Sequence, residues 1–467
     1  MRLKSLYRCQ QCGFATPKWA GQCTDCESWN TLAEEVVQVG SSSPQKAAGG
    51  RALTEFSSEI TVLSKAPERE SARAATGIGE LDRLLGGGLV PGQVVLLAGP
   101  PGIGKSTLML QAAYRLAGTK SKVLYVSGEE SLGQVSGRAK RLGIKSDSIY
   151  LVSETNLAKV LDAMKEIAPQ VLILDSVQTV YHPDLAGSPG SVGQVRECAA
   201  ELLRAAKSKD TITFLLGHVT KEGSLAGPKV LEHIVDTVLY FDTERHHLLR
   251  ILRADKNRFG PSSEIGIFEM GEKGLVEVPD ASAFFVSERA EEPAAGRAVS
   301  VAVEGSRPLL IEVQALVAPT RYPLPRRMAA GLDLGRTQLL IAALEKHLRL
   351  PLENRDVFLS LSGGMRQKDP SLDLAACMAL VSSAKDAALP ADAVFLGEVG
   401  LLGQIGRVAF LPQRLKEAAR LGFKRAFVPA RSLKELSNHG LVLEGVATVS
   451  DCVAKLISSK DSQRENS

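Results

Sequence analysis

The sequence predicts an α/β domain built on a parallel sheet, preceded by a small cysteine-rich module and followed by a second, α+β domain. Between about residues 76 and 280, short apolar runs alternate with helical patterns. The runs are apolar throughout, as strands covered on both faces require, and their alternation with helices is typical of a parallel sheet. Four cysteines stand in the first 26 residues, and from residue 297 strand and helix patterns continue in mixed order.

The composition is that of an ordinary globular protein. Of 467 residues, 44% are hydrophobic and 23% charged, and the net charge of +4 is too small to argue for nucleic acid or membrane binding. No apolar run approaches the ~18 residues that span a bilayer, and the basic start lacks the apolar stretch of a signal peptide. Seven cysteines, four of them in tight pairs, favour a reducing compartment over a disulfide framework. We therefore expect a cytoplasmic protein with no membrane partner.

Three polar stretches divide the chain. They predict a flexible linker, a second short linker and a disordered tail over residues 36–75, 286–296 and 459–467. The structured parts that remain are residues 1–35, 76–285 and 297–458.

The strands expected in the middle part are runs of four or five mostly apolar residues. These runs are Val94–Ala98, Lys122–Val126, Ile149–Val152, Val171–Leu174 and Thr213–Leu216. Two later runs, Thr237–Phe241 and Leu248–Leu252, flank a polar stretch and predict a hairpin appended to the sheet.

The N-terminal module carries two Cys-x2-Cys pairs separated by ten residues, Cys9 with Cys12 and Cys23 with Cys26. Four thiolates in a tetrahedron suit Zn²⁺, and a site with no open position is structural. Redox dithiols or an iron centre are the alternatives. The module is too small to fold around a core of its own, so the metal would supply the folding free energy. We expect Trp19 and Trp29 to pack in it, with contact to a base or partner as the alternative.

A phosphate-binding loop follows the first core strand. The motif G-x4-G-K-[ST] lies between a strand and a helical stretch, which is the context it requires. Its glycines let backbone N–H groups converge on phosphate oxygens at a helix N-terminus. Lys105 would reach the β- and γ-phosphates of ATP, and the Ser106 hydroxyl would bind Mg²⁺. The residues of this loop are Gly99, Pro100, Pro101, Gly102, Ile103, Gly104, Lys105, Ser106 and Thr107.

Carboxylates end two further strands. Asp175 follows Val171–Leu174 and is the expected acid that acts on Mg²⁺ through bound water. Glu129 and Glu130 follow another strand, and open α/β sheets bind ligands at the ends of their strands. We favour Glu129 as the group that orients the attacking water, with Glu130 as a residue that only favours the helix start.

The segment Thr76–Gly92, read together with the phosphate loop, resembles the RecA/KaiC/DnaB class of ATPases. In that class the glutamate after the second strand activates water, which matches Glu129. The class also places a polar sensor of the γ-phosphate at the end of a later strand, and His218 resembles it. The alternative for His218 is a residue that caps a turn.

The motif Lys256–Gly260 narrows the resemblance to the RadA/Sms family of bacterial DNA-repair ATPases. The order of the four-cysteine head, the RecA-like core and a Lon-protease-like domain agrees with that family. The resemblance implies a homo-oligomeric, hexameric ring that binds single-stranded and branched DNA. It also implies that ATP hydrolysis drives branch migration, in cooperation with a recombinase such as RecA.

Lys256 and Arg258 lie two residues apart on an extended segment, so their side chains point the same way. They could project into the phosphate site of a neighbouring subunit, where an added cation stabilises the transition state. A solvated basic turn is the alternative.

DNA contacts need cations on adaptable loops. In RecA-like proteins the loops after the Asp175 and His218 strands line the DNA channel, and the C-terminal domain offers a basic stretch to duplex DNA. The candidate contacts are Arg196, Lys221, Lys229, Arg321, Arg326 and Arg327.

The C-terminal domain resembles the Lon protease fold, and Ser371 falls at the position of the Lon nucleophile. Lon uses a lysine as the base for this serine. Here Ala418 occupies the lysine position, Lys416 is directed elsewhere, and Asp373 replaces the glycine after the nucleophile. We therefore expect no peptidase activity. The segments that carry the resemblance are Gln367–Cys377 and Ala393–Gly406.

Two other functions remain open on the sequence. One is a KaiC-like signalling ATPase that never contacts DNA, and the other is an ATP-dependent protease. All three functions share ATP and Mg²⁺, and the cysteine head adds Zn²⁺.

Overall fold

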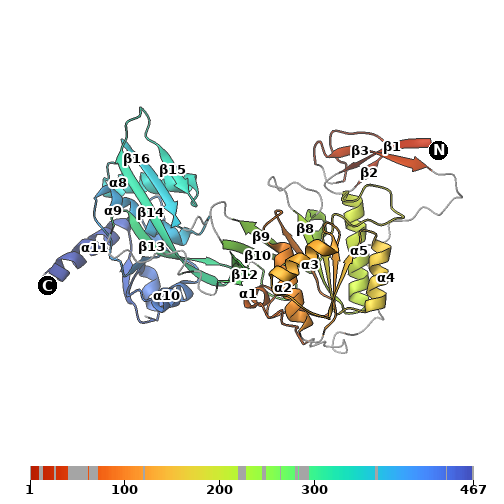
Figure 1. The fold of residues 1–467 in the computed structure, drawn as a ribbon. Helices are drawn as coiled ribbons and strands as arrows, with labels where there is room; N and C mark the ends of the chain where they lie inside the picture. Colours follow the sequence, from red (N-terminus) through yellow and green to blue (C-terminus); the bar gives the residue numbers. More distant parts are fainter. Residues whose placement is uncertain are drawn as a thin grey trace. The chain divides into compact units, whose positions relative to one another are not determined.

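The computed structural model describes residues 2–9, 14–25, 28–39, 62, 72–118, 121–218, 228–243, 249–262, 264–278, 282, 294–362, 366–437 and 439–464. It divides into two compact units (Figure 1). The first comprises residues 1–243 and 248–277, and the second comprises residues 244–247 and 278–467.

The N-terminal module is a three-stranded antiparallel sheet in the order β2-β1-β3. Its strands are β1 (Arg2–Cys9), β2 (Ala15–Thr16) and β3 (Leu32–Val39). Strand β3 extends past residue 35, where we expected a linker to begin. The prediction that Trp19 and Trp29 pack inside this module is wrong, because 60% and 69% of their surfaces are exposed. A module of this size buries only a few side chains, among them Cys9, Cys23 and Leu32.

The central sheet has nine described strands in the order β12-β11-β10-β9-β4-β8-β7-β5-β6. The six from β9 to β6 in this order are parallel, which confirms the predicted parallel sheet, and β9 and β10 form the predicted hairpin. The parallel strands are β4 (Val94–Gly99), β5 (Val123–Ser127), β6 (Ile149–Ser153), β7 (Val171–Asp175), β8 (Ile212–His218) and β9 (Thr237–Thr243). The antiparallel strands are β10 (Leu249–Asn257), β11 (Ile265–Gly271) and β12 (Gly274–Glu277).

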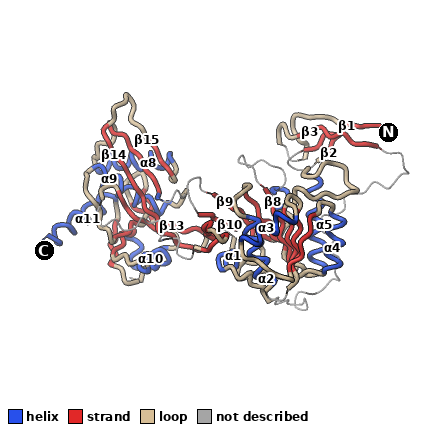
Figure 2. Tube along the Cα trace, viewed as in Figure 1, coloured by secondary structure: helices blue, strands red, loops and turns tan. Residues whose placement is uncertain are grey.

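Helices cover both faces of this sheet (Figure 2). Alternate residues of each strand face opposite layers: Val95 and Leu97 pack in one core, and Val94 and Leu96 in the other. Because both layers are apolar, the strands read as continuous apolar runs. The helices of the first layer are α1 (Gly79–Leu84), α2 (Lys105–Ala117) and α3 (Leu132–Arg141). Those of the second layer are α4 (Leu157–Ile167), α5 (Val192–Ser208) and α6 (Pro228–Glu232).

The strand order brings the motif-bearing loops together. Strands β4, β8, β7 and β5 are neighbours, and being parallel they end at one edge of the sheet. Gly99 pairs with His218, and Ser127 pairs with Asp175. The phosphate loop, His218, Asp175 and the Glu129–Glu130 segment therefore meet at this edge.

The second unit is built on a mixed seven-stranded sheet in the order β15-β16-β14-β13-β17-β20-β21, with a separate β18–β19 pair. This confirms the predicted α+β domain. Its strands are β13 (Arg297–Glu304), β14 (Arg307–Pro319), β15 (Arg327–Ala330), β16 (Arg355–Leu361), β17 (Ala393–Phe395), β18 (Glu398–Val399), β19 (Ile405–Gly406), β20 (Arg425–Pro429) and β21 (Val442–Val446). Its helices are α8 (Leu334–Leu348), α9 (Asp373–Ala384), α10 (Leu411–Arg420) and α11 (Val449–Arg464).

Helix α11 differs from the prediction at the C-terminus. It runs to Arg464, so most of the segment 459–467 that we expected as a disordered tail continues the helix. Its polar composition does not oppose this, because residues such as Lys, Gln and Arg are good helix formers. Within the described part of the chain, every helix is too short or too polar to traverse a bilayer.

Candidate nucleotide-binding site

The phosphate loop ends at Gly104, where α2 begins. Gly104 has φ of 119°, a left-handed conformation that favours glycine. A Cβ atom there would lie 3.1 Å from Met270 and 3.2 Å from Leu275. The glycine thus lets the backbone turn into α2 beneath the neighbouring β11 and β12, and the N–H groups of the first helical turn are left without intrahelical partners, as anion binding requires.

Lys105 is buried beside the loop that precedes it. Its Nζ donates to the carbonyl oxygens of Gly99, at 2.8 Å, and Pro100, at 3.0 Å. Burial lowers the pKa of the Lys105 ammonium to about 8, although the nearby charges of Asp175 and Glu129 oppose this shift. The negative charge of a phosphate chain would stabilise the ammonium form of this side chain.

His218 connects Lys105 to Glu129. Lys105 Nζ lies 3.2 Å from His218 Nδ1, and His218 Nε2 lies 3.1 Å from Glu129 Oε1. Because an ammonium group can only donate, Nδ1 accepts, and the proton of a neutral ring is then assigned to Nε2. Nε2 is buried and close to Glu129, but the contact does not have hydrogen-bond geometry. The Ser176 hydroxyl donates to the same Glu129 oxygen at 2.5 Å. The Glu129 carboxylate is thereby held at the end of β7.

Asp175 is held from within the sheet. The hydroxyl of Tyr125 donates to Asp175 Oδ2 at 2.7 Å. Burial and the adjacent Asp175 carboxylate raise the pKa of Tyr125 well above its ordinary value, so the phenol stays protonated and keeps donating. This fixes one carboxylate oxygen of Asp175 beside the start of α2.

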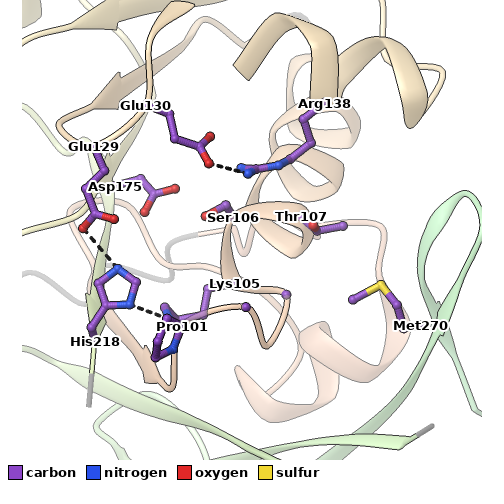
Figure 3. A pocket seen from close by; sticks show the side chains of 12 residues that line it. Pro101, Lys105, Ser106, Thr107, Glu129, Glu130, Arg138, Asp175, His218 and Met270 are labelled. Atoms are coloured by element: carbon purple, nitrogen blue, oxygen red, sulfur yellow. Dashed lines mark hydrogen bonds and ion pairs between the residues drawn. The ribbon is translucent and has the colours of Figure 1, made fainter. Parts of the chain in front are cut away.

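The two glutamates after β5 have different partners. Glu130 forms an ion pair with Arg138 at 2.5 Å, while Glu129 turns to His218 (Figure 3). Glu129 also accepts from the hydroxyl of Ser176. The side chain of Glu129 is therefore the one placed on the His218 side of the cavity.

These side chains line a cavity of about 350 Å³. Its lining includes most of the predicted phosphate-site residues, whereas Gly99 and Pro100 contribute by accepting from Lys105, and Ile103 is buried. The cavity is lined by Pro101, Gly102, Gly104, Lys105, Ser106, Thr107, Glu129, Glu130, Arg138, Asp175, His218 and Met270.

Sequence reasoning missed several residues of this site. The side-chain amide of Gln178 clamps the backbone of His218, accepting from its N–H at 3.0 Å and donating to its C=O at 2.9 Å. Ser176 and Tyr125 flank predicted residues, but hydroxyls beside a carboxylate are too common in sequences to be a signal. Arg138 and Met270 reach the cavity only because the fold brings α3 and β11 there.

Lys256 and Arg258 contact their own unit and do not line this cavity. Lys256 Nζ donates to the carbonyl oxygens of Glu232, His233 and Val235, at 2.7, 3.4 and 2.9 Å. These carbonyls lie at and just after the end of α6, where a cation is favoured. Burial, and then the charge of Arg258, lower the pKa of Lys256.

Arg258 pairs with the buried carboxylate of Asp236 at 3.2 Å. Asp236 also accepts from Lys207 at 3.0 Å and from the N–H of Val94 at 3.1 Å. The carboxylate therefore joins α5, β4 and the motif that contains Arg258. The side chain of Arg258 remains 54% exposed.

The predicted DNA contacts are scattered. Arg196 is half-buried on α5, Lys229 is exposed on α6, and Lys221 lies outside the described residues. In the second unit Arg321 is exposed, whereas Arg326 and Arg327 already form hydrogen bonds with other residues. Arg326 donates twice to Asp356 and stacks 4.6 Å from the ring centre of Tyr322. Arg327 donates to the backbone carbonyls of Leu352 and Arg355, just before and at the start of β16.

Of the four predicted zinc ligands, Cys9 and Cys23 are described and buried, while Cys12 and Cys26 lie outside the described residues. The N–H of Cys9 bonds to the C=O of Phe14 at 2.8 Å, and the N–H of Cys23 to the C=O of Ser28 at 2.9 Å. Each of these bonds joins the first cysteine of a Cys-x2-Cys pair to the residue five positions later. The matching bonds, and the burial of Cys9 and Cys23 in one cluster, fit a four-thiolate zinc site.

The environment of Ser371 is unlike a peptidase site. The hydroxyl is fully buried and accepts from the Arg414 guanidinium at 2.6 Å, and Arg414 also pairs with Asp369 at 2.8 Å. A guanidinium stays protonated and cannot act as a base. Ala418 is buried and Lys416 is exposed, so no described lysine serves Ser371.

The parallel sheet, the phosphate loop and the converging acidic residues define a P-loop ATPase. In agreement, the AAA domain family matches residues 63–224, and the rubredoxin metal binding domain family matches residues 7–34. The chain is thus an ATP-hydrolysing enzyme that carries a metal-binding domain at its N-terminus.

Curated relatives identify the family. The DNA repair protein RadA of Bacillus subtilis (strain 168) is 48% identical over 97% of this chain and 98% of the relative. The proteins of the same name from Halalkalibacterium halodurans and Listeria monocytogenes are 45% and 47% identical, over 96% and 90% of this chain and 98% and 91% of those relatives. The chain belongs to the RadA family of DNA repair proteins.

Because the Asp236 carboxylate is buried and accepts from several groups, its removal should lower the stability of the first unit strongly. Asp236→Ala leaves the Val94 N–H and Lys207 without their acceptor. We therefore expect the free energy of unfolding of the first unit to fall by about 3–5 kcal/mol and its thermal midpoint by roughly 6–20 °C. Arg258→Ala removes only an exposed partner and costs less than about 1 kcal/mol. Thermal unfolding of both variants measures this, and equal midpoints would contradict it.

Proposed function

We propose that this chain is a DNA-repair and recombination ATPase of the cytoplasm that binds single-stranded and branched DNA. ATP hydrolysis would drive branch migration of recombination intermediates, with the chain assembled as a hexameric ring and working with a recombinase such as RecA. The observation that carries the proposal is the chain of contacts from Lys105 through His218 to Glu129. It joins the phosphate loop to the sheet edge from which the two candidate DNA loops depart. The name of the relatives, DNA repair protein, supports the same conclusion.

Each residue of the site has a role in this proposal. Lys105 and the loop N–H groups would bind the β- and γ-phosphates. The Ser106 hydroxyl would hold Mg²⁺ directly and Asp175 through bound water, and the metal would neutralise phosphate charge. Glu129 takes the proton of the attacking water, and the hydroxyl of Ser176 orients its carboxylate, with the ring of His218 in contact beside it. A γ-phosphate that arrives at Lys105 would replace His218 Nδ1 as an acceptor of the Lys105 ammonium, so the position of His218 would report the nucleotide state.

Gln178 connects His218, and through it Lys105, to the candidate DNA loops. Its amide holds both backbone groups of His218, and it lies between Asp175 and the loop that begins at residue 179. Movement of His218 would therefore be transmitted to both loops. Arg196, Lys221 and Lys229 are the proposed phosphate contacts there. In the second unit Arg321 is exposed enough to bind duplex DNA, whereas Arg326 and Arg327 would first have to leave their protein partners.

A shared active site predicts rescue between subunits. Arg258→Ala should bind ATP yet hydrolyse it about 10³-fold more slowly, because a cation supplied to the neighbouring phosphate site is lost. Lys105→Ala should abolish hydrolysis. A mixture of the two variants should regain turnover, since Lys105→Ala subunits still supply Arg258. Steady-state ATPase assays of the mixtures test this.

The control replaces Lys105→Ala by the double variant Lys105→Ala/Arg258→Ala, which supplies no cation and should give no rescue. Turnover that stays low in both mixtures would contradict the supply of Arg258 to a neighbouring subunit.

The zinc proposal predicts that the loss of one cysteine ligand unfolds the N-terminal module and leaves the ATPase domain folded. Cys23→Ser should lose the zinc and unfold the module while ATP binding persists, because the metal supplies its folding free energy. Cys452→Ser, at a buried cysteine of the second unit, is the matched control and should keep a full zinc content. Metal analysis of the purified proteins measures the zinc content of both variants, and zinc retained by Cys23→Ser would refute the ligand set.

The experiment that tests the proposed function is ATP turnover with and without single-stranded DNA. We expect clear stimulation that fades steeply with added salt, because phosphate contacts release counterions. Turnover indifferent to DNA would favour a signalling ATPase instead.

A further inference from the structure

Arg138 is the cationic side chain of the cavity that the roles above leave unused. It comes from α3 and reaches over the start of α2 toward Glu130 (Figure 3). Its Nη2 donates to Glu130 at 2.5 Å. Its Nη1 is buried and has no hydrogen-bond partner among the described residues.

The burial of this nitrogen is not a by-product of helix packing. Of the α3 side chains only Val135 is fully buried, and the next cations along the helix, Lys140 and Arg141, are exposed. A buried N–H group without an acceptor costs free energy, and native structures rarely tolerate one without a reason. Since Nη1 belongs to a residue that lines the cavity, an occupant of the cavity is the natural source of the acceptor.

The charges of the cavity indicate what that occupant is. Three carboxylates line it, from Glu129, Glu130 and Asp175, against the cations of Lys105 and Arg138. A nucleotide adds several negative charges on its phosphates, so a second cation opposite Lys105 favours binding. A guanidinium presents its donors in a rigid fork that suits phosphate oxygens, which a lysine cannot match.

We propose that Arg138 Nη1 donates to a phosphate oxygen of the bound nucleotide, and that Glu130 positions the guanidinium through Nη2. This makes Arg138 a nucleotide-binding residue within its own subunit and gives Glu130 a positioning role. The proposal rests on ATP binding by the cavity and is independent of any action on DNA.

A purely structural ion pair between Arg138 and Glu130 is the competing explanation, and it makes a different prediction. If the pair only holds α3 in place, removing either partner should do equal harm to nucleotide binding. If Arg138 binds phosphate, Glu130→Gln leaves the guanidinium in the cavity and removes a negative charge beside the phosphates. Glutamine keeps an oxygen that accepts from Nη2, so the positioning contact survives while the negative charge is lost; Glu130→Gln should then bind ATP more tightly, and Arg138→Ala more weakly.

The test is equilibrium binding of MgATP and MgADP to the full-length chain, by calorimetry. Arg138→Ala should weaken MgATP binding about 10–100-fold, the range of one charge-assisted hydrogen bond. Arg138→Lys should recover part of the loss, and Lys140→Ala, the exposed control on the same helix, should stay within about twofold of the wild type. A loss shared by ADP places the contact on the α- or β-phosphate, and a loss confined to ATP places it on the γ-phosphate.

Thermal midpoints measured in parallel separate binding from folding, and if Arg138→Ala is unstable, Arg138→Gln replaces it. Wild-type affinity in a folded Arg138→Ala or Arg138→Gln would overturn the proposal, as would equal losses from Glu130→Gln and Arg138→Ala. Failure of the wild-type chain to bind MgATP would instead refute the ATP site itself, and DNA stimulation is not read in this assay.

Discussion

The rest of the site depends on one buried ammonium group. Lys105 is held between the Gly99 and Pro100 carbonyls and the ring of His218, and through His218 it is joined to Glu129. Burial costs this charge part of its stability, so the site is arranged to receive phosphate oxygens. The sheet makes the arrangement possible, because the strands that end in these residues are parallel neighbours.

Much of this could be predicted from sequence because the relevant signals are local. Apolar runs indicate strands covered on both faces, and a phosphate loop needs its lysine, hydroxyl and glycines within a few residues. The partners of Lys256 and Arg258, at the end of α6 and on Asp236, are fixed by tertiary packing and left no such signal. The same holds for Arg138 and Gln178. The exposure of Trp19 and Trp29 was mispredicted because apolar character alone does not say whether a small module has a core to bury them.

In the second unit, buried ion pairs surround the position of Ser371. Ser371 stands where the resemblance to Lon places a nucleophile, yet its hydroxyl now accepts from the buried, permanently charged Arg414, which Asp369 balances. Asp373, in place of a glycine, pairs with Arg336, and burial raises its pKa. These ion pairs join α8 to α9 and α10 to the segment that precedes α9. Such pairs fix geometry more than they add stability.

The central claim is that Lys105 exchanges His218 for phosphate when nucleotide binds, so that His218 reports the occupancy of the site. A crystal structure of the full-length chain with Mg²⁺ and a non-hydrolysable ATP analogue measures this directly. The account predicts Lys105 Nζ on the β- and γ-phosphate oxygens and well beyond hydrogen-bond distance of His218 Nδ1. An analogue bound in the cavity with the Lys105–His218 contact still at 3.2 Å would contradict it.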